Sequence, residues 1–393
     1  NRPHDNHYAH PVEGLTAIVD INRGEVVRID DYGVVPVPRE ESNYSARFQP
    51  TWRSGLKPIE VVQPEGPSFT VDGWAVEWCG WSFRVGFTPR EGLVLHDLKL
   101  RDGATVRSIL KRASLAEMVV PYGHPADVHP RKNAFDCGEY GIGVLANSLT
   151  LGCDCLGAIH YFDAVVNRID GSAQVIENAI CLHEEDCGVL WKHTDFRTEE
   201  TEVRRGRRLV ISFVATVGNY EYGFYWHLYL DGTVELDVRL TGIVNTAGLT
   251  QQGETGRGTR IGPGVVGHIH QHVFNVRLDM EVDGPNNTVV EVDTVADPPG
   301  PENPWHNALS ILETPLLTEK AARRRTDAAR MRWWKIVNRE RTTALGHHPG
   351  YRLVPHSALR TPAAPLSQVG QRAGFVTHDI WVTPTSAEER WPA

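Results

Sequence analysis

The stretch LVISFVATVGNYEYGFYWHLYL, residues 209–230, decides the fold. β-branched and aromatic residues dominate it, as is typical of a strand. Directly after it, Asp231-Gly232 suits the positive backbone dihedrals of a tight turn, and Val234–Leu240 follows as a further strand-like run. We therefore predict a hairpin within a sheet, with Asn219-Tyr220-Glu221-Tyr222-Gly223 at the start of a central, well-ordered strand.

Similar short runs recur along the chain, separated by Gly, Asp and Pro, and we read three more as strands: Val76–Phe87, Ala158–Val166 and Val273–Val282. The best helical signal is Thr318–Arg330, with Thr318 as a possible N-cap. No stretch has the composition of a linker between domains. We expect a mostly β protein in which residues 1–393 form one large β-sandwich.

Composition narrows the class of protein. The chain has 393 residues, is 41% hydrophobic and carries a formal net charge of -9, which opposes a nucleic-acid partner because phosphate binding needs a basic surface. No apolar run approaches the roughly 20 residues of a membrane helix, and the first residues do not resemble a signal peptide. We expect a soluble protein, cytoplasmic or secreted, without a membrane partner.

A second motif, His270-Gln271-His272, follows fifty residues after Tyr220. Successive side chains of an extended chain alternate between faces, so both imidazoles should project from one side and could hold one metal ion. Imidazole suits copper, zinc, iron or nickel, and histidines in a strand can also simply face solvent or donate hydrogen bonds. A cupin-type site is a weaker interpretation, because Asn275-Val276-Arg277 stands where a cupin would place glutamate.

Thr216–Gly223, together with this His-x-His motif, resembles the signature of copper amine oxidases, in which the first tyrosine of the strand becomes the quinone cofactor topaquinone. The resemblance extends over almost the whole chain and is strongest to actinobacterial phenylethylamine and histamine oxidases. Other similar blocks are Phe83–Phe87, Arg90–Asp97, Arg112–Met118, Pro121–Gly123, His183–Asp186 and Leu190–Asp195.

The resemblance implies a catalytic set. Tyr220 would be the topaquinone precursor, and His270 and His272 would bind copper. Asp136, in the block Phe135–Tyr140, would be the base that takes the α-proton once the amine is a Schiff base on the quinone. Burial near a dry pocket would raise its pKa towards neutrality. The implied activity is oxidation of a primary, arylalkyl amine by O2 to aldehyde, ammonia and hydrogen peroxide, without NAD or flavin.

Further residues would support that chemistry. Tyr122 would hold the quinone through a hydrogen bond, and Asn219 would pack beside it and limit its rotation. Three residues would line the substrate channel: Ala134, Phe135 and Gly138. Bacterial relatives often place an aromatic gate at the position of Ala134, so alanine there predicts a wider entrance.

The resemblance also implies several structural features. Cys155 and Cys181 match an intrachain disulfide. Asp279 and Met280 resemble part of a peripheral calcium or manganese site, with a carboxylate and a main-chain oxygen as ligands. A homodimer with long hairpin arms is the implied assembly.

Against the family pattern, the chain lacks the small N-terminal domains and the C-terminal segment with a third copper histidine. We expect an incomplete sequence of a normal enzyme. Other histidines could in principle substitute for that ligand: His306, His347, His348, His356 and His378. Two rival hypotheses are a non-catalytic β-sandwich, truncated and unable to complete its copper site, and a zinc or iron site of hydrolytic or oxygenase type.

Overall fold

The predicted hairpin forms one edge of a five-stranded antiparallel sheet, and the strand that begins at Tyr220 lies next to that edge rather than at the centre. Val217 pairs with Tyr220 across a turn in which Gly218 has φ 63°, and Tyr220 pairs with Gly242 on the other side. The run 209–230 is thus two adjacent strands. The sheet order is β12-β11-β10-β9-β8, with β8 (His160–Asn167), β9 (Ala173–Thr194), β10 (Thr201–Val217), β11 (Tyr220–Tyr229) and β12 (Val234–Gly242).

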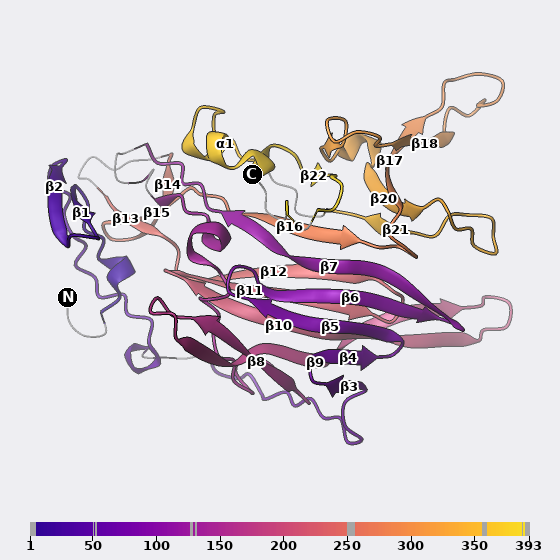
Figure 1. Cartoon of the computed structure of the whole chain (residues 1–393), viewed down its shortest axis with the longest axis horizontal. Helices are drawn as coiled ribbons and strands as arrows, with labels where there is room; N and C mark the ends of the chain where they lie inside the picture. The colour runs from indigo at the N-terminus through magenta and orange to yellow at the C-terminus, as the bar shows by residue number, and fades with distance from the viewer. Residues whose placement is uncertain are drawn as a thin grey trace.

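A six-stranded antiparallel sheet packs against the first one (Figure 1). Its order is β16-β7-β6-β5-β4-β3, with β3 (Phe69–Asp72), β4 (Ala75–Trp78), β5 (Trp81–Thr88), β6 (Gly92–Asp102), β7 (Thr105–Val119) and β16 (Val273–Met280). Phe87 meets Phe213 edge to face, with ring centroids 6.3 Å apart. Both sheets contribute to one buried core, which confirms the mostly β, sandwich-type prediction.

Two predicted strands were wrong in their extent: residues 209–230, which the turn at Gly218 divides, and Val76–Phe87. Val76–Phe87 is not continuous, because Cys79 and Gly80 adopt φ values of 44° and 91° and turn the chain between β4 and β5. Glycine adopts this conformation without a steric penalty, and cysteine does so rarely. The other predicted strands correspond to β8, β12 and β16.

Smaller sheets surround the sandwich. They comprise β1 (Leu15–Asp20) with β2 (Glu25–Asp31); β13 (Thr246–Gly248), β15 (Val265–His268) and β14 (Gly258–Gly262); β18 (Leu309–Pro315), β17 (Asn287–Ala296), β20 (Trp333–Asn338) and β21 (Gly350–Leu353); and β19 (Arg323–Arg324) with β22 (Ile380–Trp381). The helical elements are short: α1 (Gln368–Arg372), 3-10 turns at His7–Ala9, Ala46–Phe48, Ala328–Arg330 and Gly374–Thr377, and one π-helical turn, η4 (Asp136–Tyr140).

The predicted helix at Thr318–Arg330 was also wrong. Thr318 does accept a hydrogen bond from the Ala321 amide at 3.3 Å, but the chain leaves the helical path after one turn. Arg324 then pairs with the buried Glu291 of β17, with its Nε 2.7 Å from the carboxylate. A tertiary ion pair has overridden the local helical preference here.

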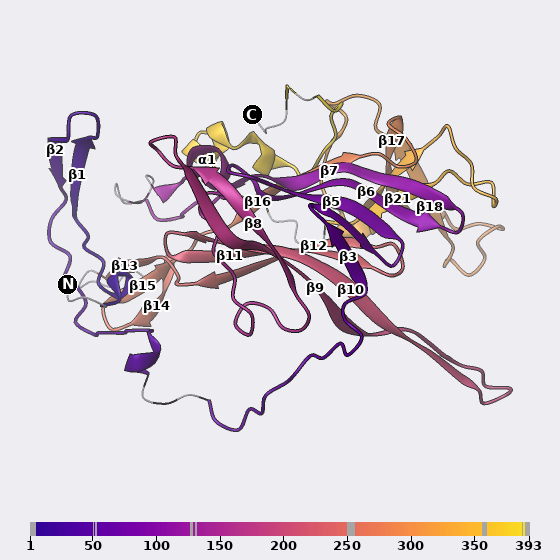
Figure 2. The same cartoon turned by 60° about the horizontal axis from the view of Figure 1, so that its bottom comes forward.

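The hairpin of β9 and β10 extends beyond the sandwich as an arm (Figure 2). Apolar side chains are exposed along it, with Trp191 at 50% and Phe196 at 90% exposure. These descriptions cover a computed structural model of residues 5–49, 51, 53–125, 129, 132–249, 256–355, 360–386 and 388–389. Within those ranges, no helix has the length and apolar character required to cross a bilayer.

Candidate active site

Tyr220 opens β11 on the face turned to the sandwich interior, and its side chain is 8% exposed. Its hydroxyl lies 3.0 Å from His270 Nε2 and 3.0 Å from the hydroxyl of Tyr122. Gly242, its register partner, has φ 90°, and a Cβ there would lie 2.7 Å from the Asn219 carbonyl oxygen. Only glycine therefore lets β12 approach the chain this closely beside the tyrosine.

His270 and His272 both lie against Tyr220, as the alternation of side chains predicts. Their ring centroids are 5.6 and 4.8 Å from that of Tyr220 and 4.9 Å from each other. His270 Nδ1 is 2.7 Å from the carbonyl oxygen of His268, so Nδ1 carries the proton and Nε2 presents its lone pair towards Tyr220. This backbone contact fixes the tautomer that a metal ligand needs.

His272 is held by a second tyrosine of β11. Its Nδ1 lies 2.9 Å from the hydroxyl of Tyr222, which is fully buried. Burial, and then the nearby His270, lowers the pKa of His272 to about 4, so its imidazole is neutral at pH 7. Two imidazoles close to one tyrosine are a donor set that fits a copper ion.

Asp136 begins η4 and is 3% exposed. Burial, and then the charges of Glu117 and Glu139, raises its pKa to about 7. Burial is the main cause that raises the pKa of Tyr122, followed by its hydrogen bond to Tyr220. The charge of Asp136 raises it further. The pKa of Tyr222 is also raised, first by burial and then by the charge of Asp136. Asp136 therefore acts electrostatically on the tyrosine cluster.

Glu117 fixes the turn that carries Asp136, and sequence reasoning assigned it no role. Its Oε1 accepts hydrogen bonds from the backbone amides of Cys137 at 3.0 Å and Gly138 at 3.2 Å. Its Oε2 pairs with Arg90 at 3.1 Å. A Cβ on Gly138 would lie 2.5 Å from that carboxylate, so the close approach requires glycine. Glu117 belongs to the resembling block Arg112–Met118, but nothing local indicates that it reaches η4.

Comparisons with known proteins agree with this geometry. Residues 70–393 match the family model "Copper amine oxidase, enzyme domain". The chain belongs to the copper amine oxidase family. It is 50% identical over 391 residues to the primary amine oxidase of Arthrobacter sp. (strain P1), and the aligned region makes up 99% of this chain and 60% of that protein. It is 48% identical to the histamine oxidase of Arthrobacter globiformis, covering 100% of this chain and 58% of that protein.

A solved relative has the same fold. The copper-containing benzylamine oxidase from Hansenula polymorpha aligns with a TM-score of 0.92 at 35% identity, over 99% of this chain and 62% of that chain. The chain spans about 60% of the length of these two curated relatives.

In this copper amine oxidase chain, Asn219 is tied to the backbone beside Tyr220. Its Nδ2 donates to the carbonyl oxygen of Ile243 at 2.6 Å, and the Ile243 amide donates back to the Asn219 carbonyl at 2.7 Å. Asn219 thus secures the end of the β11–β12 hairpin, and its predicted role beside a cofactor stays a prediction.

The three predicted channel residues surround Asp136 in sequence and differ in environment. Ala134 is partly buried, and Gly138 is exposed while its backbone contacts Glu117. Phe135 packs in a small apolar cluster with Val119, and Arg372 stacks over its ring at 4.5 Å. The channel assignment stays a prediction for all three.

Cys155 and Cys181 lie in one small buried cluster at the edge of the five-stranded sheet. Both are free thiols in the structure and hydrogen-bond to one another, and with His183 they form a group whose donor atoms all lie within 4.8 Å. They are neighbours, and the disulfide between them stays a prediction.

The other residues predicted to bind metal ions do not belong to a cluster of three potential ligand side chains in the described part of the chain. Asp279 Oδ1 accepts a hydrogen bond from Thr385 Oγ1 at 2.7 Å, and Met280 ends β16 beside it. In the described part of the chain, two groups of three potential ligands come together, and neither contains Asp279, His270 or His272. None of the proposed substitute histidines 306, 347, 348 and 378 is in those groups, and His356 lies outside the described residues.

Proposed function

We propose that this chain is the catalytic part of a primary-amine oxidase that converts an arylalkyl amine, O2 and water to aldehyde, ammonia and hydrogen peroxide. Its cofactors would be copper at His270 and His272 and topaquinone made from Tyr220. When bound, copper with O2 supplies the oxidation that makes the quinone, and the quinone accepts electrons from the amine carbon. The relatives named as primary amine, histamine and benzylamine oxidases support this class of substrate.

One observation carries the proposal: the Tyr220 hydroxyl lies 3.0 Å from the lone-pair nitrogen of His270, next to a second neutral imidazole. A metal held by these nitrogens would be close to the phenol ring that has to be oxidised. Burial of Tyr220 in the sandwich restricts its contacts to a few groups, so the oxidation would be confined to this ring.

Asp136 supports the proposal as the base. A carboxyl group with a pKa of about 7 is partly ionised at neutral pH and basic enough to accept a proton from carbon. Glu117 raises that pKa as a charge and also holds the turn through two backbone amides. Tyr122, bonded to the Tyr220 hydroxyl, would restrict rotation of the ring so that the amine meets the correct edge.

The test is to compare Tyr220→Phe with Tyr222→Phe in copper-loaded protein. Both tyrosines lie on the buried face of β11 and each bonds one histidine, so they are a matched pair. Tyr220→Phe should abolish the phenylhydrazine adduct band and quinone staining while copper remains bound. Tyr222→Phe should retain both. A quinone that survives in Tyr220→Phe would refute the assignment.

A homodimer is the proposed assembly, supported by the exposed apolar side chains along the β9–β10 arm. Light scattering should give twice the mass of one chain. Trp191→Asp should shift the protein towards monomer, and Val165→Asp, at an exposed apolar position on β8, is the control. A dimer unaffected by Trp191→Asp would place the interface elsewhere.

A peripheral calcium or manganese ion is proposed at Asp279, with the main-chain oxygen of Met280 as a second ligand. The Asp279 carboxylate accepts a hydrogen bond from Thr385 at its Oδ1. Metal analysis of Asp279→Ala should show loss of one such ion without loss of copper. Unchanged calcium and manganese content would contradict this site.

The comparisons do not support the truncated, non-catalytic alternative, since the family model covers the chain from residue 70 onwards and Tyr220, Asp136, His270 and His272 are all present.

A further inference from the structure

Three histidines far apart in sequence meet beside the candidate active site. His124 follows the Tyr122 segment, His129 comes five residues later, and His268 ends β15. Their ring centroids are 4.4 to 4.6 Å apart; two rings are stacked at an interplanar angle of 15°, and the third stands edge-on to both. One donor atom from each lies within 4.8 Å of the others.

Burial favours the neutral form of His129, the middle histidine of this cluster in the sequence. His129 is 3% exposed and His268 is 5% exposed. Burial, then the charges of Lys132, His268 and His124, lowers the pKa of His129 to about 3. Neutral imidazoles are the form that binds metal ions.

His129 provides a second, independent observation. Its Nδ1 is fully buried and has no hydrogen-bond partner among the described residues. Leaving a buried nitrogen unpartnered is unfavourable, so such groups in native proteins usually bind an ion or a water. A metal ion among the three rings would satisfy it.

A carboxylate stands next to the cluster. Glu13, which comes from the N-terminal segment, places Oε2 3.9 Å from His129 Nε2. Lys132 is also nearby; it donates to Asn245 at 3.1 Å, and burial lowers its pKa although Glu13 partly opposes that shift. Glu13 can therefore either bind a metal directly or accept a hydrogen bond from a metal-bound imidazole.

We propose that His124, His129 and His268, assisted by Glu13, form a second metal site that takes a zinc ion. Three imidazoles and one carboxylate match a tetrahedral zinc site, in which ligand atoms lie about 3.4 Å apart. The present spread of up to 4.8 Å requires only small side-chain movements. Copper(II) prefers a tetragonal arrangement, so zinc suits this cluster better.

The site would be coupled to the copper pair through the backbone. The carbonyl oxygen of His268 orients His270 by accepting from its Nδ1. Zinc on the His268 side chain would fix the same residue, and Glu13 would tie the N-terminal segment to it. The ion would thus be structural, holding one copper ligand in position from the side opposite Tyr220.

The test uses the copper-loaded protein equilibrated with zinc and analysed for both metals, with cobalt(II) absorption as a second reading of tetrahedral geometry. We expect one zinc per chain in addition to copper, with the cobalt band of a tetrahedral site. His129→Ala should lose both signals. His160→Ala, at a partly buried histidine of β8 that meets Phe162 edge to face, is the matched control and should keep them.

Circular dichroism and the melting temperature of the zinc-free proteins separate loss of the site from loss of fold. Zinc should raise the melting temperature of the unsubstituted protein and of His160→Ala and leave that of folded His129→Ala unchanged. His129→Asn gives a second, more conservative substitution if the alanine variant is unstable. Zinc bound equally by a folded His129 variant, or no zinc beyond the copper content, would overturn the proposal.

The His270→Ala/His272→Ala double variant distinguishes the two sites. It should lose copper and quinone and still bind zinc. Failure of the amine oxidase proposal would therefore leave the zinc result readable, and loss of both metals in this variant would show that the histidines form a single site.

Discussion

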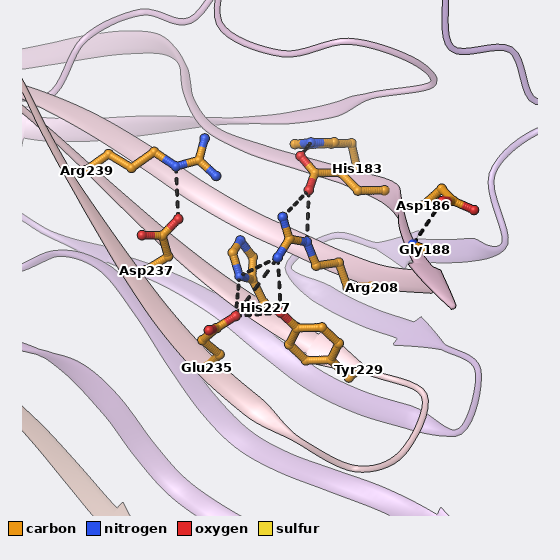
Figure 3. Close-up of polar contacts among 10 residues, drawn as sticks. His183, Asp186, Gly188, Arg208, His227, Tyr229, Glu235, Asp237 and Arg239 are labelled. Carbon is orange, nitrogen blue, oxygen red and sulfur yellow. Dashed lines mark hydrogen bonds and ion pairs between the residues drawn. The ribbon is translucent and has the colours of Figure 1, made fainter. Parts of the chain in front are cut away.

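The two faces of β11 show how one strand can carry both chemistry and structure. On the inner face, Tyr220 and Tyr222 bond to histidines and lie in the field of a carboxyl group with a raised pKa. On the outer face, Tyr229 and His227 of β11 contact charged residues of the neighbouring strands (Figure 3). Arg208 of β10 hydrogen-bonds to the Tyr229 hydroxyl and makes two hydrogen bonds of 2.7 and 2.9 Å to Glu185 of β9, and His227 Nδ1 lies 3.0 Å from the Glu235 carboxylate of β12.

The difference lies in how the charges are satisfied. Ionic groups on the outer face are paired across strands, with the cations and carboxylates in contact. On the inner side, Asp136 is buried near two other carboxylates, Glu117 and Glu139. Burial and then these negative charges raise its pKa, so it binds a proton more tightly than an exposed aspartate. We therefore expect substitutions around the inner face to change rates and those on the outer face to change stability.

Asp136→Asn should produce the largest effect. Asparagine keeps the shape and removes the base, so kcat/KM should fall by about 10²–10⁴-fold. Quinone formation should persist, because the hydrogen bonds of the Tyr220 hydroxyl go to Tyr122 and His270. Steady-state kinetics alongside phenylhydrazine titration measure the two separately. Activity within threefold of the unsubstituted protein would remove Asp136 from the inner-face chemistry.

The pH profile should show the same group. The base works only when deprotonated, so kcat/KM should rise with pH through about 7 and fall about tenfold per pH unit well below it. Asp136 has its pKa raised, so protonation is favoured up to neutral pH, in contrast to an exposed aspartate. A profile flat between pH 5 and 8 would contradict this reading.

Glu117 should sharpen the comparison because it acts through both charge and hydrogen bonding. Glu117→Gln keeps an oxygen acceptor for the Cys137 and Gly138 amides and removes a charge that raises the pKa of Asp136. The rise of kcat/KM with pH should therefore move to lower pH. Glu117→Ala removes both, so it should also lower kcat. If kcat/KM of both variants rises over the same pH range as in the unsubstituted protein, Glu117 has only a structural role.

Ala134→Tyr tests the predicted wide entrance. A bulky ring there should reduce kcat/KM for phenylethylamine and tyramine severalfold more than for a small alkylamine, since added side-chain volume costs on the order of 1–3 kcal/mol when it overfills a site. Ala134→Ser is a control of nearly unchanged size. Unchanged ratios among the amines would contradict a channel at this position.

The smallest effect should come from the outer face. Arg208→Met removes the pairing with Glu185 and Tyr229 and keeps much of the side-chain volume, so the free energy of unfolding should fall by about 1 kcal/mol. kcat should not change. Denaturant unfolding measures the free energy of unfolding, and amine turnover measures kcat. A large loss of turnover in a folded Arg208→Met variant would break the distinction between the two faces.

The sequence could predict features that depend on local periodicity. The two histidines at spacing two, the strand with Tyr220 and the turn at Asp231-Gly232 all follow from the alternation of side chains and turn preference. The resemblance to a family supplied the predicted role of Asp136. It could not supply the physical reason why the pKa of Asp136 is raised, which is burial and then the charges of Glu117 and Glu139.

Long-range contacts could not be predicted. Glu117 reaches the backbone of η4 from β7, Glu291 draws Arg324 away from a helical path, and the histidine cluster joins residues more than a hundred positions apart. Each depends on the closed sandwich, which a single sequence pattern does not encode.

The arrangement around Tyr220 also has a consequence for the order of events in the cell. Its hydroxyl partners come from positions 98 and 50 residues away, in different parts of the chain. Contacts of that separation form late, because loop closure precedes them and strand pairing between distant segments is slow. We expect maturation of the ring to wait for the last folding step, so a ribosome-bound or partly folded chain would hold the metal poorly and stay colourless.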